Sequence, residues 1–174
     1  TNPQSQVVRS FPEIIKMNLP KVELNWEEIV VGATTGVLRQ TENMRQKISW
    51  GSGADFDWYK KWGQTISGSL AEQALAKKMQ SYFSHSVNNF HGSDLKINGK
   101  SVQVRSQLES KKTNNLIVRK GYKKTDYYFL VLDDLPTFYF AGYVAPHNIE
   151  RLGEWTNFHI QSRPYVWSIP KEKL

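Results

Sequence analysis

Cysteine is absent from this chain of 174 residues, and its absence excludes disulfide bonds and every metal site built on thiolate ligands. Long apolar runs are absent too: none is long enough to cross a bilayer, and none has the pattern of a signal-peptide core. The chain contains no internal repeat and no low-complexity tract. From these absences we expect a soluble, cytoplasmic protein with no membrane partner.

Several motifs that mark common enzyme classes are missing as well. The chain has no Gly-x-Ser-x-Gly elbow, no phosphate-binding Gly-Lys-Ser/Thr loop and no dinucleotide fingerprint. No two of its four histidines stand three or four residues apart, so the sequence predicts no zinc motif of that spacing. Any chemistry must therefore come from carboxylates, amides and basic residues.

Basic residues exceed acidic ones, which gives a formal net charge of +7 at pH 7 and a sequence pI near 9.5. A positive surface favours polyanionic partners, and nucleic acid comes ahead of an anionic membrane. The hydrophobic content of 39% and the aromatic content of 13% are ordinary for a globular protein. A chain of this length is expected to form one domain with a substantial core.

The N-terminal end differs in pattern from the rest of the chain. Residues 1–24 are interrupted by Pro12 and Pro20 and predict an irregular arm, whereas residues 25–174 predict a single domain. Asn25 is a candidate N-cap for the first element of that domain.

A long helix is predicted from Asn25 to about Gln46, because apolar residues recur there at helical spacing. Gly32 and Gly36 weaken a helix by about 1 kcal/mol each relative to alanine. Their spacing of four residues allows close packing against another helix, and a break near Thr34 is the alternative.

The segment Trp50–Trp62 is dense in aromatic residues. A loop and a short helix that pack their rings onto the core are one interpretation. A platform on which nucleic-acid bases stack is the other.

A β-hairpin is the most informative stretch of the sequence. Asn98-Gly99 separates two short alternating runs, and both central residues of a type I′ turn need a positive φ. In the second strand Gln103 and Arg105 face one side, because side chains alternate along a strand. Asp94 lies just ahead of the first strand. The hairpin thus brings an acid, an amide and a permanent cation to one sheet edge.

Further elements are predicted on both sides of this hairpin. Gly68–Met79 has a helical apolar pattern, with Glu72 in its first turns where the helix dipole favours a carboxylate. Tyr127–Leu132 is typical of a central strand buried on both faces, and Thr137–Val144 of a second hairpin arm. Tyr165–Ile169 predicts a last strand at a sheet edge.

A helix with Glu72, then Asp94, then a strand with Gln103-x-Arg105 resembles the PD-(D/E)XK nuclease superfamily, over roughly residues 66–143. The resemblance implies a restriction-endonuclease-like α/β (α+β) fold, with a mixed, mostly antiparallel central sheet flanked by helices. It also implies Mg²⁺- or Mn²⁺-dependent cleavage of nucleic-acid phosphodiesters, with DNA as the expected substrate. The same segments are similar to small tailed-phage proteins, so a bacterial or phage-infected cell is the expected source.

Residue roles follow from this resemblance. Asp94, Glu72 and Gln103 would surround the metal ion, and Arg105 would contact the scissile phosphate. The sequence departs from the family pattern at Gln103, where a second carboxylate is usual, and at Arg105, where lysine is usual. Guanidinium stays protonated, so Arg105 orients and neutralises the phosphate but cannot act as a general base.

Basic loops beyond the hairpin are candidates for holding the phosphate backbone. The nucleic-acid-binding residues predicted there are Lys111, Lys112, Lys120, Lys123 and Lys124. The oligomeric state stays open, with a homodimer among the options.

Two other functions compete with the nuclease. Taken singly, each site residue has an ordinary structural explanation: a turn carboxylate, solvent-facing strand residues or a helix-terminal acid. A nuclease-fold protein that binds nucleic acid without cleaving it, or a phage structural or assembly protein, are the alternatives.

Overall fold

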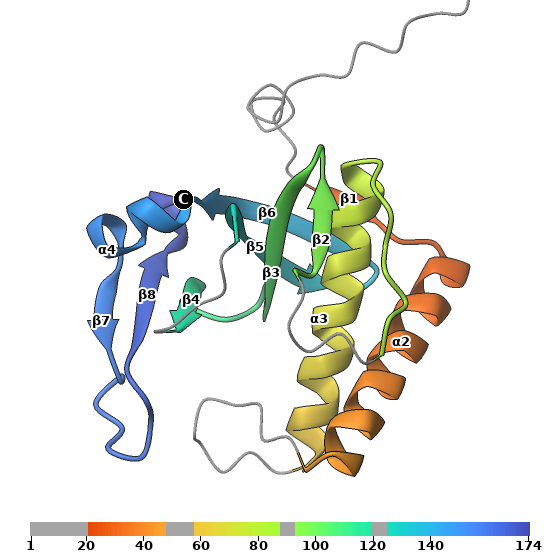
Figure 1. Ribbon diagram of the computed structural model, residues 1–174, viewed down its shortest axis with the longest axis horizontal. Helices are drawn as coiled ribbons and strands as arrows, with labels where there is room; N and C mark the ends of the chain where they lie inside the picture. The colour runs from red at the N-terminus through yellow and green to blue at the C-terminus, as the bar shows by residue number, and fades with distance from the viewer. Residues whose placement is uncertain (1–20, 48–57, 88–92, 120–124) are drawn as a thin grey trace, which may run out of the picture.

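Helices, a five-stranded sheet and a three-stranded sheet form three layers (Figure 1). The computed structural model describes residues 21–47, 58–87, 93–119 and 125–174. Its helices are α2 (Trp26–Arg45), α3 (Trp58–Lys78) and the short α4 (Ile149–Leu152), with 3-10 turns η1 (Pro146–Asn148) and η2 (Lys171–Lys173). Its strands are β1 (Lys21–Glu23), β2 (Leu95–Ile97), β3 (Lys100–Leu108), β4 (Asn115–Arg119), β5 (Tyr127–Asp134), β6 (Thr137–Val144), β7 (Glu154–Thr156) and β8 (Val166–Pro170).

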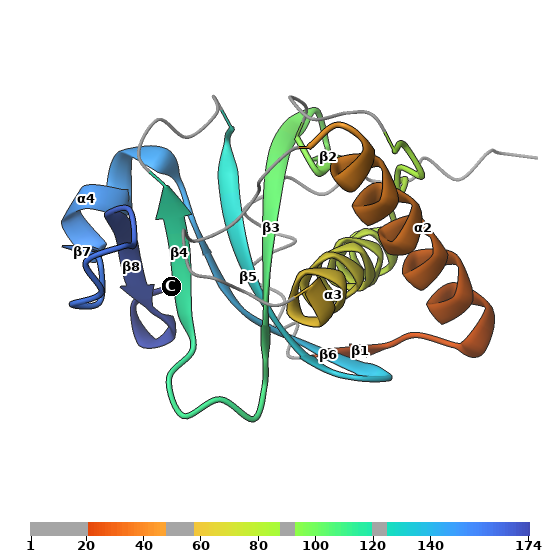
Figure 2. The ribbon, with the colours of Figure 1, turned by 90° about the horizontal axis from the view of Figure 1, so that it is seen from below.

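The larger sheet has the strand order β1-β6-β5-β3-β2, and β3 with β5 is its parallel pair. The other three pairs are antiparallel, so the predicted mixed, mostly antiparallel sheet in an α+β protein is confirmed. Figure 2 shows α2 and α3 on one side of this sheet and the smaller sheet on the other. The main helices therefore cover one face, and the second sheet, which we did not predict, covers the opposite face.

The smaller sheet has the order β4-β8-β7 and is antiparallel throughout. The prediction of an edge position for Tyr165–Ile169 is wrong, because β8 lies between its two neighbours. Its partner β7 is three residues long and has no apolar run that would reveal it. A second difference lies at Lys21–Glu23, expected in the irregular arm, which pairs with β6 as β1. Residues 1–20 of that arm lie outside the described residues.

Strand β5 is buried on both faces, as predicted from its apolar run. Phe129 and Val131 face the helices and join the core there. Tyr128, Leu130 and Leu132 face the smaller sheet and join a second core with residues of β4 and β8. The two cores lie back to back across one sheet.

The β2–β3 hairpin has the predicted turn. Asn98 and Gly99 both have positive φ, at 48° and 77°, as a type I′ turn requires. Ile97 pairs with Lys100 across this turn, and Leu95 pairs with Val102. Leu95 and Val102 are buried in the helix-side core, which fixes the register of the hairpin.

Helix α2 begins at the predicted cap and runs without a break. The Asn25 side chain accepts a hydrogen bond from the Glu28 N–H at 2.8 Å, and the Glu28 carboxylate accepts one from the Asn25 N–H at 2.7 Å. This capping box satisfies two backbone donors at the helix start. The alternative of a break near Thr34 is wrong.

Helix α3 begins ten residues before the predicted start, so Glu72 lies well beyond its first turns and that part of the prediction is wrong. The aromatic segment explains the difference, because Trp58 and Tyr59 form the first turn and stack on each other at 3.9 Å between ring centroids. Residues 50–57 of that segment lie outside the described residues, and residues 60–62 belong to α3. No helix among the described residues has the length and hydrophobicity needed to span a membrane.

Glycines bring α2 and α3 close together. A Cβ on Gly36 would lie 2.7 Å from the Ile66 Cα and 3.1 Å from the Thr65 carbonyl oxygen. A Cβ on Gly32 would lie 2.5 Å from the Gln73 side-chain oxygen. The predicted close packing at these two glycines is confirmed, and α3 lies between α2 and the sheet.

We expect Gly36→Ala to lower the free energy of unfolding by about 1 to 2 kcal/mol, because overpacking against a neighbouring backbone outweighs the gain in helix propensity. Gly63→Ala is the matched control, since a Cβ there meets nothing within 4 Å. That variant should gain up to about 1 kcal/mol. Urea denaturation of both variants measures the difference. Equal gains in the two variants would contradict close packing at Gly36.

Candidate active site

The edge of β3 is where the predicted site residues meet. Strand β2 pairs only with the first three residues of β3, so it ends before Val104. The Asp94 side chain continues where β2 stops, because its Oδ2 accepts a hydrogen bond from the Val104 N–H at 2.7 Å. An otherwise open donor of a sheet edge thus holds the carboxylate in place.

Arg105 contacts both the backbone of Val104 and the side chain of Asp94. Its Nη1 donates to the Val104 carbonyl oxygen at 3.0 Å and lies 3.8 Å from Asp94 Oδ2. Its Nη2 donates to the Gln103 Oε1 at 3.2 Å. The Arg105 guanidinium is therefore hydrogen-bonded to the Gln103 side chain, as expected for residues two apart on one face of a strand. It is also within ion-pair range of Asp94.

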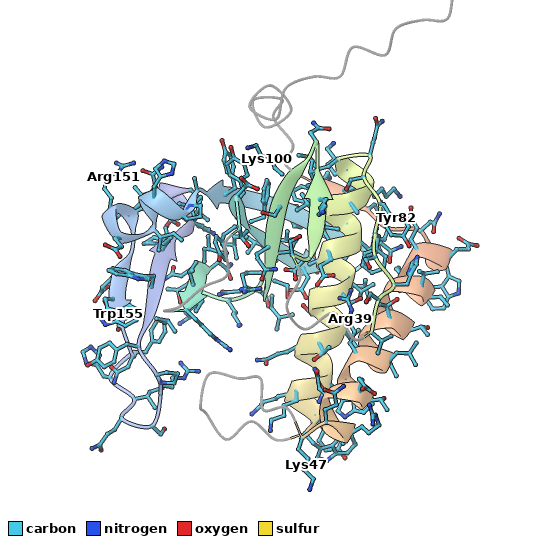
Figure 3. All side chains as sticks on the ribbon, viewed as in Figure 1. Arg39, Lys47, Tyr82, Lys100, Arg151 and Trp155 are labelled. Atoms are coloured by element: carbon cyan, nitrogen blue, oxygen red, sulfur yellow. The ribbon has the colours of Figure 1, made fainter. Side chains whose placement is uncertain are left out.

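Glu72 approaches this edge from the helix side. It is buried, and its Oε2 accepts a hydrogen bond from Arg39 Nη1 at 2.7 Å. Arg39 also donates to the carbonyl oxygens of Ser84, at 3.0 Å, and Ser86, at 3.1 Å. Arg39 therefore ties α2 to Glu72 on α3 and to the segment that leaves α3 toward Asp94 (Figure 3).

Burial, and after it the charge of the nearby Asp94, raise the pKa of Glu72 to about 8 in the folded protein. Arg39 and Arg105 act in the opposite direction. Because Asp94, Arg39 and Arg105 all affect the pKa of Glu72, the Glu72 carboxyl lies within electrostatic range of these three side chains. The structure thus places Glu72, Asp94 and Arg105 in one charged cluster, with Gln103 bound to Arg105.

Strand geometry explains how residues from two sides of a sheet come together. Gln103 pairs in register with Tyr128, whose side chain faces the smaller sheet, whereas Glu72 lies on the helix that covers the other face. The short β2 leaves the edge of β3 open at Val104, and Asp94 lies there, within electrostatic range of Glu72 and 3.8 Å from Arg105. Asp94 bridges the two sides at that edge.

Two arginines in this cluster were not predicted as site residues. Arg39 follows Gly32 and Gly36 at intervals of four and three residues and therefore lies on the same face of α2. This spacing could have predicted that Arg39 faces α3. Arg119, at the end of β4, has its pKa lowered by burial and then by the charge of Arg105. Its position beside the site depends on the second sheet, and nothing in its local sequence indicates it.

Of the five predicted lysines, the structure describes Lys111 and Lys112. Lys111 and Lys112 are exposed in the turn between β3 and β4. Lys120, Lys123 and Lys124 lie outside the described residues. The assignment of all five to nucleic-acid binding stays a prediction.

The donor set fits a hard divalent cation. Magnesium prefers oxygen ligands, and Glu72, Asp94 and Gln103 offer two carboxylates and an amide oxygen. A carboxylate accepts several bonds, so a contact with Arg39 does not prevent a second one to a metal ion. The pKa of Glu72 is raised by burial first and by the charge of Asp94 second, and a bound cation would oppose both effects. Among the described residues, no group of three or more acidic, histidine or cysteine side chains is placed to hold a metal.

Comparison of the chain with models of protein families, with curated proteins and with solved structures finds no match. The interpretation of the site therefore depends on the residues and their geometry.

The raised pKa of Glu72 predicts a stability that depends on pH. Between the ordinary value of 4.5 and about 8, the unfolded chain has lost this proton while the folded chain still binds it. The free energy of unfolding should then fall as pH rises through this window, by up to about 1.4 kcal/mol per pH unit. Urea denaturation from pH 5 to pH 8 measures the slope.

Two variants separate Glu72 from the other titrating groups. Glu72→Gln should remove its part of the slope, since the amide does not titrate. Glu150→Gln, an exposed residue of α4, should keep the wild-type slope. Identical slopes in the two variants would show that Glu72 titrates alike in the folded and unfolded chains.

Proposed function

We propose that this protein is a Mg²⁺- or Mn²⁺-dependent nuclease that acts on DNA, with a restriction-endonuclease-like arrangement of its central sheet. The observation that supports this proposal is the convergence of Glu72, Asp94, Gln103 and Arg105 at the edge of β3. Residues from a helix, a loop and a strand, separated by up to 33 positions in the sequence, contribute to one charged cluster.

The acidic residues hold the metal in this proposal. Asp94 and Glu72 supply the negative charge, and Gln103 adds a neutral oxygen. When bound, the ion polarises the phosphodiester and lowers the pKa of a water molecule, which supplies the nucleophile. With two carboxylates in place of three, Asp94, Glu72 and Gln103 would hold a free metal ion weakly, and a substrate phosphate would add further oxygen ligands.

Arg105 neutralises the phosphate. Guanidinium remains charged at any working pH and binds phosphate oxygens through two parallel N–H donors. In the described structure these donors contact the Val104 carbonyl and Gln103 Oε1. A phosphate that accepts the hydrogen bonds of the Arg105 guanidinium would replace Gln103 Oε1 as the acceptor of Nη2. Substrate binding and the completion of the metal site are therefore coupled through one side chain.

Arg39 has a supporting role in this site. Its contacts with Glu72 and with the carbonyls of Ser84 and Ser86 hold the acid and the incoming segment in position. It also offsets part of the negative charge of the two acids when no cation is bound.

Cleavage assays on single- and double-stranded DNA and RNA, with Mg²⁺ and with Mn²⁺, test the enzyme. Asp94→Asn should abolish cleavage. Arg105→Ala should lower the rate about a hundredfold, as removal of one transition-state donor does elsewhere. Gln103→Glu should raise metal affinity, because Mg²⁺ prefers carboxylate oxygen.

The matched control is Asp134→Asn, which changes an exposed acid at the far end of β5 and should leave cleavage unchanged. If wild type and Gln103→Glu cleave no substrate above the Asp94→Asn background, the nuclease proposal fails.

A second candidate is a protein of the same fold that binds nucleic acid without cleaving it. The neutral Gln103 and the permanently charged Arg105 favour it, because they make a site better suited to holding a phosphate than to deprotonating water. Arg39 and Arg119 add positive charge near Arg105.

Salt dependence of DNA binding tests the predicted role of the β3–β4 turn. Replacing Lys111 and Lys112 together by alanine should lower the slope of log affinity against log salt by about 2, because each phosphate contact contributes about 0.9. The double variant of Lys171 and Lys173, exposed in η2, is the matched control and should keep the slope. An unchanged slope in both would show that the turn lysines face away from the DNA.

A further inference from the structure

Helix α2 has its apolar side turned away from the protein. The residues that it buries against α3 are small or polar: Gly32, Thr35, Gly36 and Gln40. Apart from Ile29, which packs against the helix-side core, its larger apolar side chains are exposed, with exposed fractions of 37% to 72%. We call these residues the outer face of α2: Trp26, Val30, Val31, Val37, Leu38 and Met44. A surface helix normally has the opposite arrangement.

The outer face consists of two parallel lines of apolar residues, and the exposed residues Glu27, Thr34 and Thr41 lie between the lines. Val30, Val37 and Met44 follow one another at intervals of seven residues, and Val31 and Leu38 repeat the same interval beside them. Two turns of an α-helix span about seven residues, so these side chains lie on one side along the helix. Figures 1 and 2 both show α2 as the outermost element of the helical layer. No other described element covers it.

Charges at the two ends of α2 have opposite sign. Glu27 is exposed in the first turn, and Lys47 is exposed two residues after the last turn (Figure 3). In an antiparallel pair of α2 helices centred on Val37, Glu27 of one copy lies near the C-terminal end of the other helix, where α2 ends at Arg45 and Lys47 follows it. Val30 then lies opposite Met44. A parallel pair would instead bring like charges together.

We propose that the outer face of α2 binds the same face of a second copy of this chain, with the two helices antiparallel and a two-fold axis at Val37. Such an interface is isologous, because each copy contributes the same surface. Its centre is apolar and its ends are charged with opposite signs, which is the usual composition of a helix–helix interface between subunits. The outer face shares no residue with the proposed site at β3, to which α2 contributes Arg39.

Sedimentation equilibrium from about 1 µM to about 100 µM protein tests the dimer, since this range covers dissociation constants typical of moderate association. Wild type should approach twice the chain mass of 20.1 kDa. Met44→Glu should remain monomeric across the range. Leu108→Glu is the matched control, because Leu108 on β3 has the same exposed fraction of 55% as Met44, and it should dimerise as wild type does.

The melting temperature of each variant is the control for folding. We expect it to equal that of wild type, because both changed positions are exposed. A wild type that stays monomeric throughout, or a Met44→Glu protein that dimerises like wild type, would overturn the proposal.

The absence of cysteine allows a test of the geometry by single introduced cysteines. Val37→Cys places two thiols at the axis and should form an intermolecular disulfide on mild oxidation. Val30→Cys should not, because its position faces residue 44 of the other copy. Efficient cross-linking at both positions would show parallel helices and contradict the two-fold arrangement. Cross-linking at neither position would contradict the pairing altogether.

Charge reversal tests the ends of the pair. Glu27→Lys and Lys47→Glu should each weaken dimerisation severalfold, because like charges then lie opposite each other. The double variant should recover most of the wild-type affinity. A double variant weaker than both single ones would exclude the antiparallel arrangement.

Discussion

The burial of both faces of β5 is the constraint on which the other layers depend. Phe129 and Val131 need apolar partners on one side, and Tyr128, Leu130 and Leu132 need them on the other. Helix α3 supplies the first set, and the smaller sheet with α4 supplies the second. Each apolar surface removed from water stabilises the fold by about 25 cal/mol per Å², so loss of either layer would expose one full face of the strand.

The candidate site arises where this layered packing ends. Strand β2 is too short to cover β3, and the open backbone donor at Val104 is satisfied by a carboxylate, Asp94. A carboxylate at that position attracts Arg105, and the buried Glu72 from the helical layer needs Arg39 for the same electrostatic reason. Asp94 and Glu72 each have a guanidinium beside them, and the burial of Glu72 keeps part of its population protonated at neutral pH.

The close approach of α2 to α3 has a consequence on the opposite side of α2. Gly32 and Gly36 permit the approach only if the small-residue side of α2 faces α3. With 3.6 residues per turn, the valines and Leu38 must then point outward. The positions of the glycines and of the larger apolar residues along α2 therefore explain both its close packing against α3 and its exposed apolar face.

The sequence by itself determined the elements whose signals are local. The turn at Asn98-Gly99, the capped start of α2 and the double-sided burial of β5 are set by residues within a few positions of one another. Tertiary structure decided the parallel pairing of β3 with β5, the central place of β8 and the start of α3 at Trp58. It also decided which cation pairs with Glu72. These features depend on contacts between residues far apart in the chain. Local sequence propensity does not distinguish between the possible strand and side-chain partners, and only the tertiary contacts select one of them.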